Sequence, residues 1–348
     1  MTSRERVIKT LLFDGPDRPP RDLWTLYFGQ MPERRRQVEA LTARFPMDMA
    51  GPPVRGRVSR RARSEPGVVG RYVDEWGSVW EVKQAGVVGE VKQPALADWK
   101  FLGDFKPPWE LIETTDLGAV DEWYERSDRF AIVFPGVRPF ERLQFLRGTE
   151  NLFLDLASGA PELERLLRMV HEFFLREIAL WAGRRCDAIQ FMDDWGTQHS
   201  LLISPRQWRE VFKPLYRDYC DAIHAQGKFA FFHSDGNIEA IYPDLIEIGV
   251  DAINSQLFCM DIERLGRLHK GRITFWGEID RQHLLPFGAP DQVKEGVRRV
   301  RRALDDGRGG VIAQCEWGVD DPPENIAAVY EAWDEPRPGS APSPFERR

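Results

Sequence analysis

Residues that could bind a metal or move a proton recur at one kind of position in this sequence, immediately after short β-rich runs. They are Asp48, Asp193, Asp194, His233, Asp235, Asn254, Gln256, Glu278, Asp280, Cys315 and Glu316. In a parallel barrel the carboxyl ends of the strands meet at one rim, where enzymes of this architecture place their chemistry. We therefore expect these side chains to converge on one site.

Four of these residues are candidate ligands for a zinc-like ion: His233, Asp235, Glu278 and Cys315. Zinc accepts imidazole, carboxylate and thiolate ligands in a tetrahedral site, and catalytic sites keep one position open or displaceable. Because residues i and i+2 of a strand point to the same face, His233 and Asp235 can share one centre. By spacing alone, the alternative for each is a hydrogen-bonded or packed residue.

The elements that must position these residues alternate between short β-rich runs and helical stretches, a pattern typical of βαβ units and a parallel sheet. Eight strands are predicted, at residues 23–28, 47–50, 130–134, 188–192, 228–232, 250–253, 272–276 and 309–313. Eight is the number that closes a (β/α)8 barrel. A doubly wound sheet would also place function at strand ends, but no glycine-rich phosphate-binding sequence follows an early strand. The predicted fold class is therefore α/β, a TIM barrel.

The predicted domain organisation is one barrel domain over residues 1–334, with an insertion at about 52–110 in its N-terminal third. An antiparallel hairpin is predicted within the insertion, over residues 68–82. Apolar residues at helical spacing predict a helix over 161–182. The proline-rich, polar segment 335–348 is predicted to be disordered.

Composition limits the classes of partner. The chain has 348 residues and a net charge of -7, which argues against nucleic acid, whose binding needs a basic face. No run approaches the roughly 18 apolar residues of a membrane span, and the start of the chain lacks the apolar stretch of a signal peptide. The four cysteines lack paired spacing and predict reduced thiols, so we expect a cytoplasmic protein.

Several stretches resemble the uroporphyrinogen decarboxylase superfamily over about residues 20–334. They are Phe191-Met-Asp-Asp-Trp-Gly-Thr-Gln198, Phe232-His-Ser-Asp-Gly236, residues 243–251, Phe275-Trp-Gly-Glu-Ile-Asp280 and Pro322-Pro-Glu-Asn325. The superfamily has two functional branches. One decarboxylates the acetate arms of uroporphyrinogen, and the other contains zinc-dependent methyltransferases that work with corrinoid proteins.

The decarboxylase branch carries an Arg-Gln-Ala-Gly-Arg-Tyr stretch after its first strand, whose arginines hold substrate carboxylates. This chain reads Thr25-Leu-Tyr-Phe-Gly-Gln30 in that register, so both arginines are missing. A bidentate guanidinium is hard to replace when a substrate carries many carboxylates. Decarboxylation of uroporphyrinogen is therefore disfavoured.

The methyltransferase branch carries His-x-Cys at the fifth strand and a cysteine nine residues before the glutamate of a Pro-x-Glu-Asn stretch. His233 and Cys315 match this pattern, whereas Asp235 replaces the middle cysteine and puts thiol-activating chemistry in doubt. A carboxylate ligand makes bound zinc a harder Lewis acid, better suited to oxygen. The resemblance thus implies methyl transfer between a small oxygen- or nitrogen-containing substrate and a corrinoid (cobalamin) carried by a partner protein.

On this hypothesis the remaining polar and aromatic rim residues serve the substrate. Asp193, Asp194, His199 and Gln256 would orient it or act as acid-base groups. Asp48, Trp195, Asn254 and Trp276 would contact it. Two other functions compete: a lyase or decarboxylase acting on another small acid, which needs no corrinoid partner, and a non-catalytic barrel that binds a tetrapyrrole or a metal.

Overall fold

The computed structural model, which describes residues 1–25 and 31–337, has a parallel barrel at its centre. Its strand order is β1-β11-β10-β9-β8-β7-β6-β2. The strands are β1 (Arg21–Trp24), β2 (Met49–Ala50), β6 (Phe130–Val133), β7 (Ala188–Met192), β8 (Phe229–Ser234), β9 (Ala252–Ser255), β10 (Thr274–Trp276) and β11 (Val311–Glu316). The Asp48 amide donates to the Arg21 carbonyl at 2.9 Å and brings β2 back toward β1. The predicted (β/α)8 fold is confirmed, although residues 26–28 of the first predicted strand lie outside the described residues.

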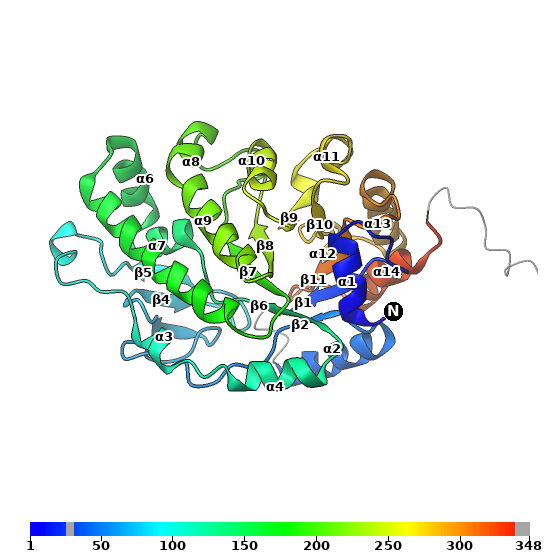
Figure 1. Cartoon of the computed structure of the whole chain (residues 1–348), viewed down its shortest axis with the longest axis horizontal. Helices are drawn as coiled ribbons and strands as arrows, with labels where there is room; N and C mark the ends of the chain where they lie inside the picture. The colour runs from blue at the N-terminus through cyan, green and yellow to red at the C-terminus, as the bar shows by residue number, and fades with distance from the viewer. Residues whose placement is uncertain (26–30, 338–348) are drawn as a thin grey trace, which may run out of the picture.

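Helices alternate with the strands and surround them (Figure 1). They are α1 (Ser3–Leu11), α2 (Pro32–Arg44), α3 (Glu110–Thr114), α4 (Gly118–Arg126), α5 (Pro139–Arg147), α6 (Thr149–Ser158), α7 (Pro161–Ala182), α8 (Pro205–Val211), α9 (Lys213–His224), α10 (Tyr242–Glu247), α11 (Ile262–His269), α12 (Leu284–Phe287), α13 (Pro290–Leu304) and α14 (Pro323–Asp334), with 3-10 turns η2 (Trp99–Phe101), η3 (Glu239–Ile241) and η4 (Leu257–Cys259). The structure confirms the helix predicted over 161–182, which buries its apolar stripe.

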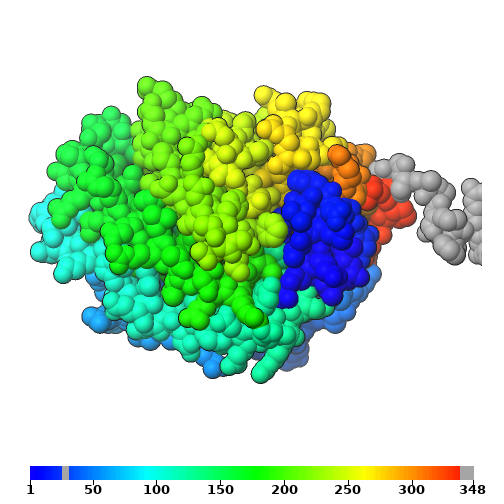
Figure 2. Space-filling model, viewed as in Figure 1, coloured from blue at the N-terminus to red at the C-terminus, as the bar shows by residue number. Residues whose placement is uncertain are grey.

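Strand side chains alternate between the barrel interior and the helices that surround it. One buried cluster fills the interior: Met49, Phe130, Ala188, Phe231, Ala252, Trp276 and Ile312. Val7 and Leu11 of α1 belong to the same cluster, so this helix packs onto the amino end of the barrel; it forms the blue patch in Figure 2. The intervening residues, such as Phe191, Phe232 and Ile253, belong to a larger cluster with the helices.

A second, antiparallel sheet lies within the insertion: β3 (Gly70–Val73), β4 (Val79–Val82) and β5 (Glu90–Gln93). The β3–β4 hairpin predicted over 68–82 is confirmed, and Asp74 shapes its turn by accepting the amides of Trp76 and Ser78. Trp76 packs edge-on against Phe173 of α7, with ring centroids 4.9 Å apart. This sheet lies on the side of the molecule opposite α1 and α14 (Figure 1).

The ends and surface of the chain add three observations. Within residues 1–25 and 31–337, no helix combines the length and apolar character needed to span a membrane. All four cysteines are free thiols. Glu335, just after α14, pairs with Arg298 at 2.7 Å, while residues 338–348 of the predicted disordered tail lie outside the described part of the chain.

Candidate metal and substrate site

Asp194, His233 and Asp235 bring three metal-ligating atoms within 4.8 Å of one another at the carboxyl end of the barrel. His233 Nε2 lies 3.5 Å from Asp194 Oδ1 and 3.6 Å from Asp235 Oδ1. His233 is in β8, and Asp194 follows β7. The Asp235 amide donates to Asp194 Oδ1 at 3.0 Å, which ties the two strand ends together. One imidazole and two carboxylates are a donor set that zinc accepts with a position left open.

Asn254 sets the orientation of the His233 ring. Its Oδ1 lies 2.6 Å from His233 Nδ1, and its own amide nitrogen donates to the Trp276 carbonyl. The amide oxygen therefore faces the ring, so Nδ1 carries a proton and Nε2 faces the two carboxylates. Outer-shell contacts of this kind fix the tautomer of a metal-binding histidine.

The charge state of His233 follows from its neighbours. Burial disfavours the charged ring, but Asp194 and Asp235 outweigh burial and raise the pKa of His233 to about 10. A protonated ring and a bound divalent cation are two ways of neutralising the same carboxylates.

Arg281 links the carboxylates of the rim and was not among the predicted site residues. Its guanidinium pairs with Asp235, with Glu316 at 2.7 Å and with Glu278 at 3.5 Å. Both Glu278 oxygens and Asp235 Oδ1 are buried and lack a hydrogen-bond partner within the described chain. Burial raises the pKa of Glu278 to about 8. Arg281 follows β10, just as the predicted rim residues follow their strands. The same positional pattern, extended to basic residues, predicts it.

A cavity of about 630 Å³ opens from this cluster toward the insertion. Asp194, His233, Asp235, Arg281 and Glu316 line one part of it. Its other walls come from the insertion sheet, the start of α5 and α7, and include Arg57, Tyr72, Trp76, Trp80, Glu141, Phe173 and Glu177. The three potential ligands therefore face a space large enough for a small substrate.

The structure does not bring Cys315 to this cluster. In β11, Gln314 and Glu316 point inward, and Cys315 between them points toward the helices. It is fully buried in the outer apolar cluster, where burial raises the pKa of its thiol. The predicted role of Cys315 as a ligand is thus corrected by strand alternation. Glu278 lies beside the cluster and contacts Arg281, but is not among the three convergent ligands.

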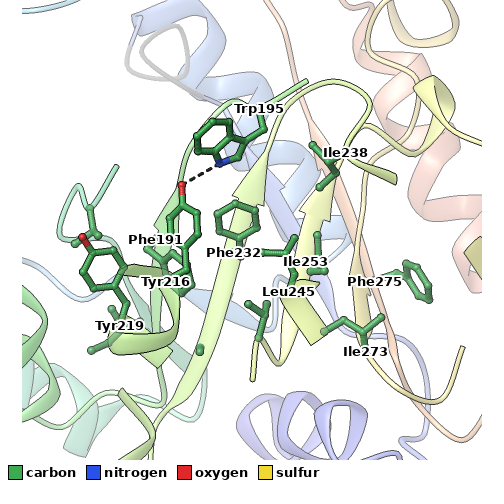
Figure 3. Packing of buried hydrophobic residues seen from close by; sticks show 14 of the residues in the cluster. Phe191, Trp195, Tyr216, Tyr219, Phe232, Ile238, Leu245, Ile253, Ile273 and Phe275 are labelled. Carbon is green, nitrogen blue, oxygen red and sulfur yellow. Dashed lines mark hydrogen bonds between the residues drawn. The ribbon is translucent and has the colours of Figure 1, made fainter. Parts of the chain in front are cut away.

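Two predicted rim residues belong to the core instead. Asp193 is fully buried and accepts the amides of Phe140 at 2.9 Å and Glu141 at 2.7 Å, and the Tyr216 hydroxyl at 2.5 Å. It anchors the start of α5, so the predicted catalytic role is corrected to a structural one. Trp195 stacks on Phe140 with ring centroids 4.0 Å apart. Its indole nitrogen donates to the Tyr216 hydroxyl at 2.9 Å within the buried cluster (Figure 3).

Three further candidates lie away from the cluster. Asp48 precedes β2 and therefore lies at the amino end of the barrel, bound to Arg6 at 2.6 Å, which corrects its predicted contact with substrate. Trp276 fills the barrel interior beneath the site. His199 is exposed on a loop and lines a separate hollow.

Gln256 and Asn254 have supporting positions at the rim. Gln256 Oε1 accepts the Gly236 amide at 2.8 Å and so holds the loop after β8. Asn254 is fully buried against His233, which makes it a residue that orients a ligand rather than one that contacts substrate.

Comparison with known proteins agrees with the fold. The chain aligns with the structure of a methyltransferase from Methanosarcina mazei over 96% of this chain and 98% of that one, with a TM-score of 0.71 and 16% identity. A xylanase 10B structure from Thermotoga maritima aligns over 96% of this chain and 98% of that one, but at a TM-score of 0.47 and 9% identity it bears on nothing further. No curated protein matches the sequence. Residues 137–336 match the family model described as uroporphyrinogen decarboxylase (URO-D). The chain therefore belongs to the uroporphyrinogen decarboxylase family, as its sequence predicts.

Proposed function

We propose that this protein is a metal-dependent methyltransferase that moves a methyl group between a small substrate and a corrinoid protein docked at the barrel rim. One observation carries the proposal: Asp194, His233 and Asp235 converge within 4.8 Å at a cavity on the carboxyl side of the barrel. Family membership and the fold shared with a methyltransferase from Methanosarcina mazei support it.

The charge balance of the site fits a divalent cation. Five carboxyl groups gather there, from Glu141, Asp194, Asp235, Glu278 and Glu316. Among the described residues, the guanidinium groups of Arg138 and Arg281 form ion pairs with members of this group, and the His233 ring lies beside Asp194 and Asp235. A bound zinc ion would offset part of the excess and act as a Lewis acid toward a substrate oxygen or nitrogen.

The protein's own side chains would divide the remaining work. Asp194 Oδ1, His233 Nε2 and Asp235 Oδ1 would hold the metal, and Asn254 would keep Nε2 free of a proton. Arg281 occupies the second oxygen of Asp235, which leaves Oδ1 available as a ligand. The cavity would hold the substrate and exclude water from the reacting groups.

The first test is the metal content of protein purified without chelator, for wild type, His233→Ala and Cys315→Ala. We expect about one zinc ion per chain in wild type and Cys315→Ala, and almost none in His233→Ala, because of these two residues His233 alone would supply a ligand. Methyl transfer to and from corrinoid proteins is then assayed with the metal-loaded enzyme. A wild-type protein that is metal-free and takes up no divalent ion would refute the proposal. Metal loss in Cys315→Ala would instead place the thiol among the ligands.

A lyase acting on a small acid is the second candidate, and the state of His233 favours it over a barrel that only binds a ligand. The raised pKa of His233 makes a charged imidazolium available, which could deliver a proton to the carbon left after loss of carbon dioxide. This candidate requires turnover without a corrinoid partner. A barrel that only binds ligand would instead show tight binding without turnover.

A further inference from the structure

The cavity next to the proposed metal site carries more negative than positive groups. Seven carboxyl groups line it, from Asp74, Glu75, Glu141, Glu177, Asp194, Asp235 and Glu316, against four guanidinium groups, from Arg57, Arg138, Arg142 and Arg281. The imidazole of His233 is the one other basic group among the described residues of this lining, so acidic groups outnumber basic ones by seven to five. Such a space favours a positively charged ligand over an anion.

The four arginines are already paired with carboxylates. Arg57 lies 2.6 Å from Glu177, and Arg142 lies 3.1 Å from Asp74. Arg281 is held by Asp235, Glu278 and Glu316, and Arg138 lies 3.6 Å from Glu141. A ligand carboxylate would have to displace a close partner from Arg57, Arg142 or Arg281 in order to bind one of them, whereas Arg138 has only the long contact with Glu141.

Glu141 is a buried carboxylate of the cavity wall whose one ion-pair contact among the described residues is long. It lies in the first turn of α5, is 8% exposed, and has its backbone amide fixed by Asp193. Its Oε2 is buried and lacks a hydrogen-bond partner among the described residues, and its contact with Arg138 at 3.6 Å is longer than a hydrogen bond. A buried acceptor without a donor is costly, so its presence in a cavity wall indicates a donor or a cation supplied by a ligand.

Aromatic rings make up much of the remaining wall. They are those of Trp24, Tyr72, Trp76, Trp80, Phe145, Phe173 and Phe174. The negative faces of aromatic rings attract alkylated ammonium groups, and a nearby carboxylate adds to that attraction. Beside Glu141, away from the three potential metal ligands, the combination favours an organic cation, because an inorganic ion gains little from apolar walls.

We propose that this cavity binds a small organic cation, an alkylated ammonium compound, with its charged nitrogen against Glu141. The proposal deepens the proposed function by giving its substrate a chemical class. Binding of the cation itself does not require the metal.

The test compares three probes by isothermal titration calorimetry on the full chain: choline, its neutral carbon isostere 3,3-dimethylbutan-1-ol, and glycine betaine. We expect choline to bind at least about tenfold more tightly than the neutral isostere, because the isostere lacks the electrostatic attraction of a quaternary ammonium to Glu141 and to the aromatic faces. Equal binding of the neutral isostere would overturn the proposal. So would equal or tighter binding of betaine, because Arg138 would then be the recognition group.

Variants assign the effect to Glu141. Glu141→Gln keeps the shape of the side chain and is expected to weaken choline binding about tenfold, with the neutral isostere and the metal content unchanged. Glu141→Asp restores the charge and should recover part of the preference. Glu75→Gln is the matched control, because Glu75 lines the same cavity but its side chain is 36% exposed, and it should change choline binding by less than about threefold. A choline preference that survives Glu141→Gln would contradict the assignment.

Failure of this inference is distinguishable from failure of the proposed function. A metal-free protein that still prefers choline refutes the metal mechanism and keeps the cation site. A zinc-loaded protein that does not prefer choline refutes the cation site and keeps the metal mechanism.

Discussion

Asp48 at the amino end of the barrel and the carboxylates that contact Arg281 at the carboxyl end differ in how many of their hydrogen-bonding sites are filled. At the amino end, Asp48 accepts bonds from Arg6 at 2.6 Å, Arg18 at 2.7 Å, Ser3 at 2.9 Å and the Arg21 amide at 2.8 Å. At the carboxyl end, Asp235 leaves one oxygen and Glu278 leaves both without a hydrogen bond from the described residues.

This difference separates stability from function. A buried carboxylate whose acceptor sites are all used is costly to delete, because its partners are left buried and unpaired. A buried carboxylate that lacks donors costs stability, so it persists where a ligand supplies the missing partner. The same division between the two faces is general among (β/α)8 barrels. In this protein it is visible in individual hydrogen bonds.

Deleting a carboxylate at each end gives the largest expected contrast. Asp48→Ala should lower the free energy of unfolding by about 3–5 kcal/mol, because the guanidinium groups of Arg6 and Arg18 lose a shared buried partner. Metal content should not change. Asp235→Asn in the metal-free protein should cost less than about 1 kcal/mol, because Glu278 and Glu316 still hold Arg281. Urea unfolding measures both, and equal losses would remove the distinction between the two ends.

The pH dependence of stability should also differ between the ends. Burial raises the pKa of Glu177, in the cavity wall, to about 7 although Arg57 opposes the shift. Between about pH 4.5 and pH 7 the native state keeps a proton that the unfolded chain releases, so the free energy of unfolding falls as pH rises, by up to about 3 kcal/mol. Glu177→Gln should flatten this slope in urea titrations at several pH values.

The matched residue at the amino end is Asp17, whose pKa is lowered mainly by its hydrogen bonds with Arg6. Its contribution to stability is present above the pKa of the unfolded chain and is lost as pH falls, which is the opposite sign. Asp17→Asn should therefore reduce acid sensitivity. Slopes of the same sign at the two ends would contradict the comparison.

The smallest expected effect sharpens the comparison within the site. Asn254→Leu removes the acceptor for His233 Nδ1 and should weaken zinc binding about 10–100-fold, as outer-shell losses do. Competition with a chromogenic chelator measures the affinity. His199→Ala, on the exposed loop, is the control and should bind zinc as wild type does. Unchanged affinity in Asn254→Leu would mean that the ring does not need this contact to stay in place.

Periodicity in the sequence predicts the barrel strands and the helix over 161–182, because burial of an apolar face leaves a regular pattern. It also predicts that His233 and Asp235 share a centre, since two residues of spacing keep one face. Periodicity does not show whether a residue near a strand end points into the barrel or toward the surrounding helices. The register of β11 pairs Cys315 with Leu23 and Glu316 with Trp24, and a shift of one residue exchanges inside and outside.

The same ambiguity separates Asp193 from Asp194, which are adjacent in sequence but point to a helix terminus and to the cavity, respectively. The position of Asp48 was missed for a different reason. The predicted strand ran over 47–50, whereas β2 starts only at Met49, so Asp48 belongs to the opposite end of the barrel. Arg281 is not predicted because metal-ligand patterns contain Asp, Glu, His and Cys. Arginine binds no metal, although its positive charge offsets the charge of neighbouring carboxylates.

The anchoring of Asp193 has a consequence for the rate at which the site can exchange its occupant. Two amides of α5 and the Tyr216 hydroxyl hold this residue, so the peptide that carries Asp194 is already ordered in the folded chain. The entropy of ordering that ligand is lost on folding and is not lost again on binding. Entry and departure of an ion then require only side-chain rotations, which are fast, and no rearrangement of the loop.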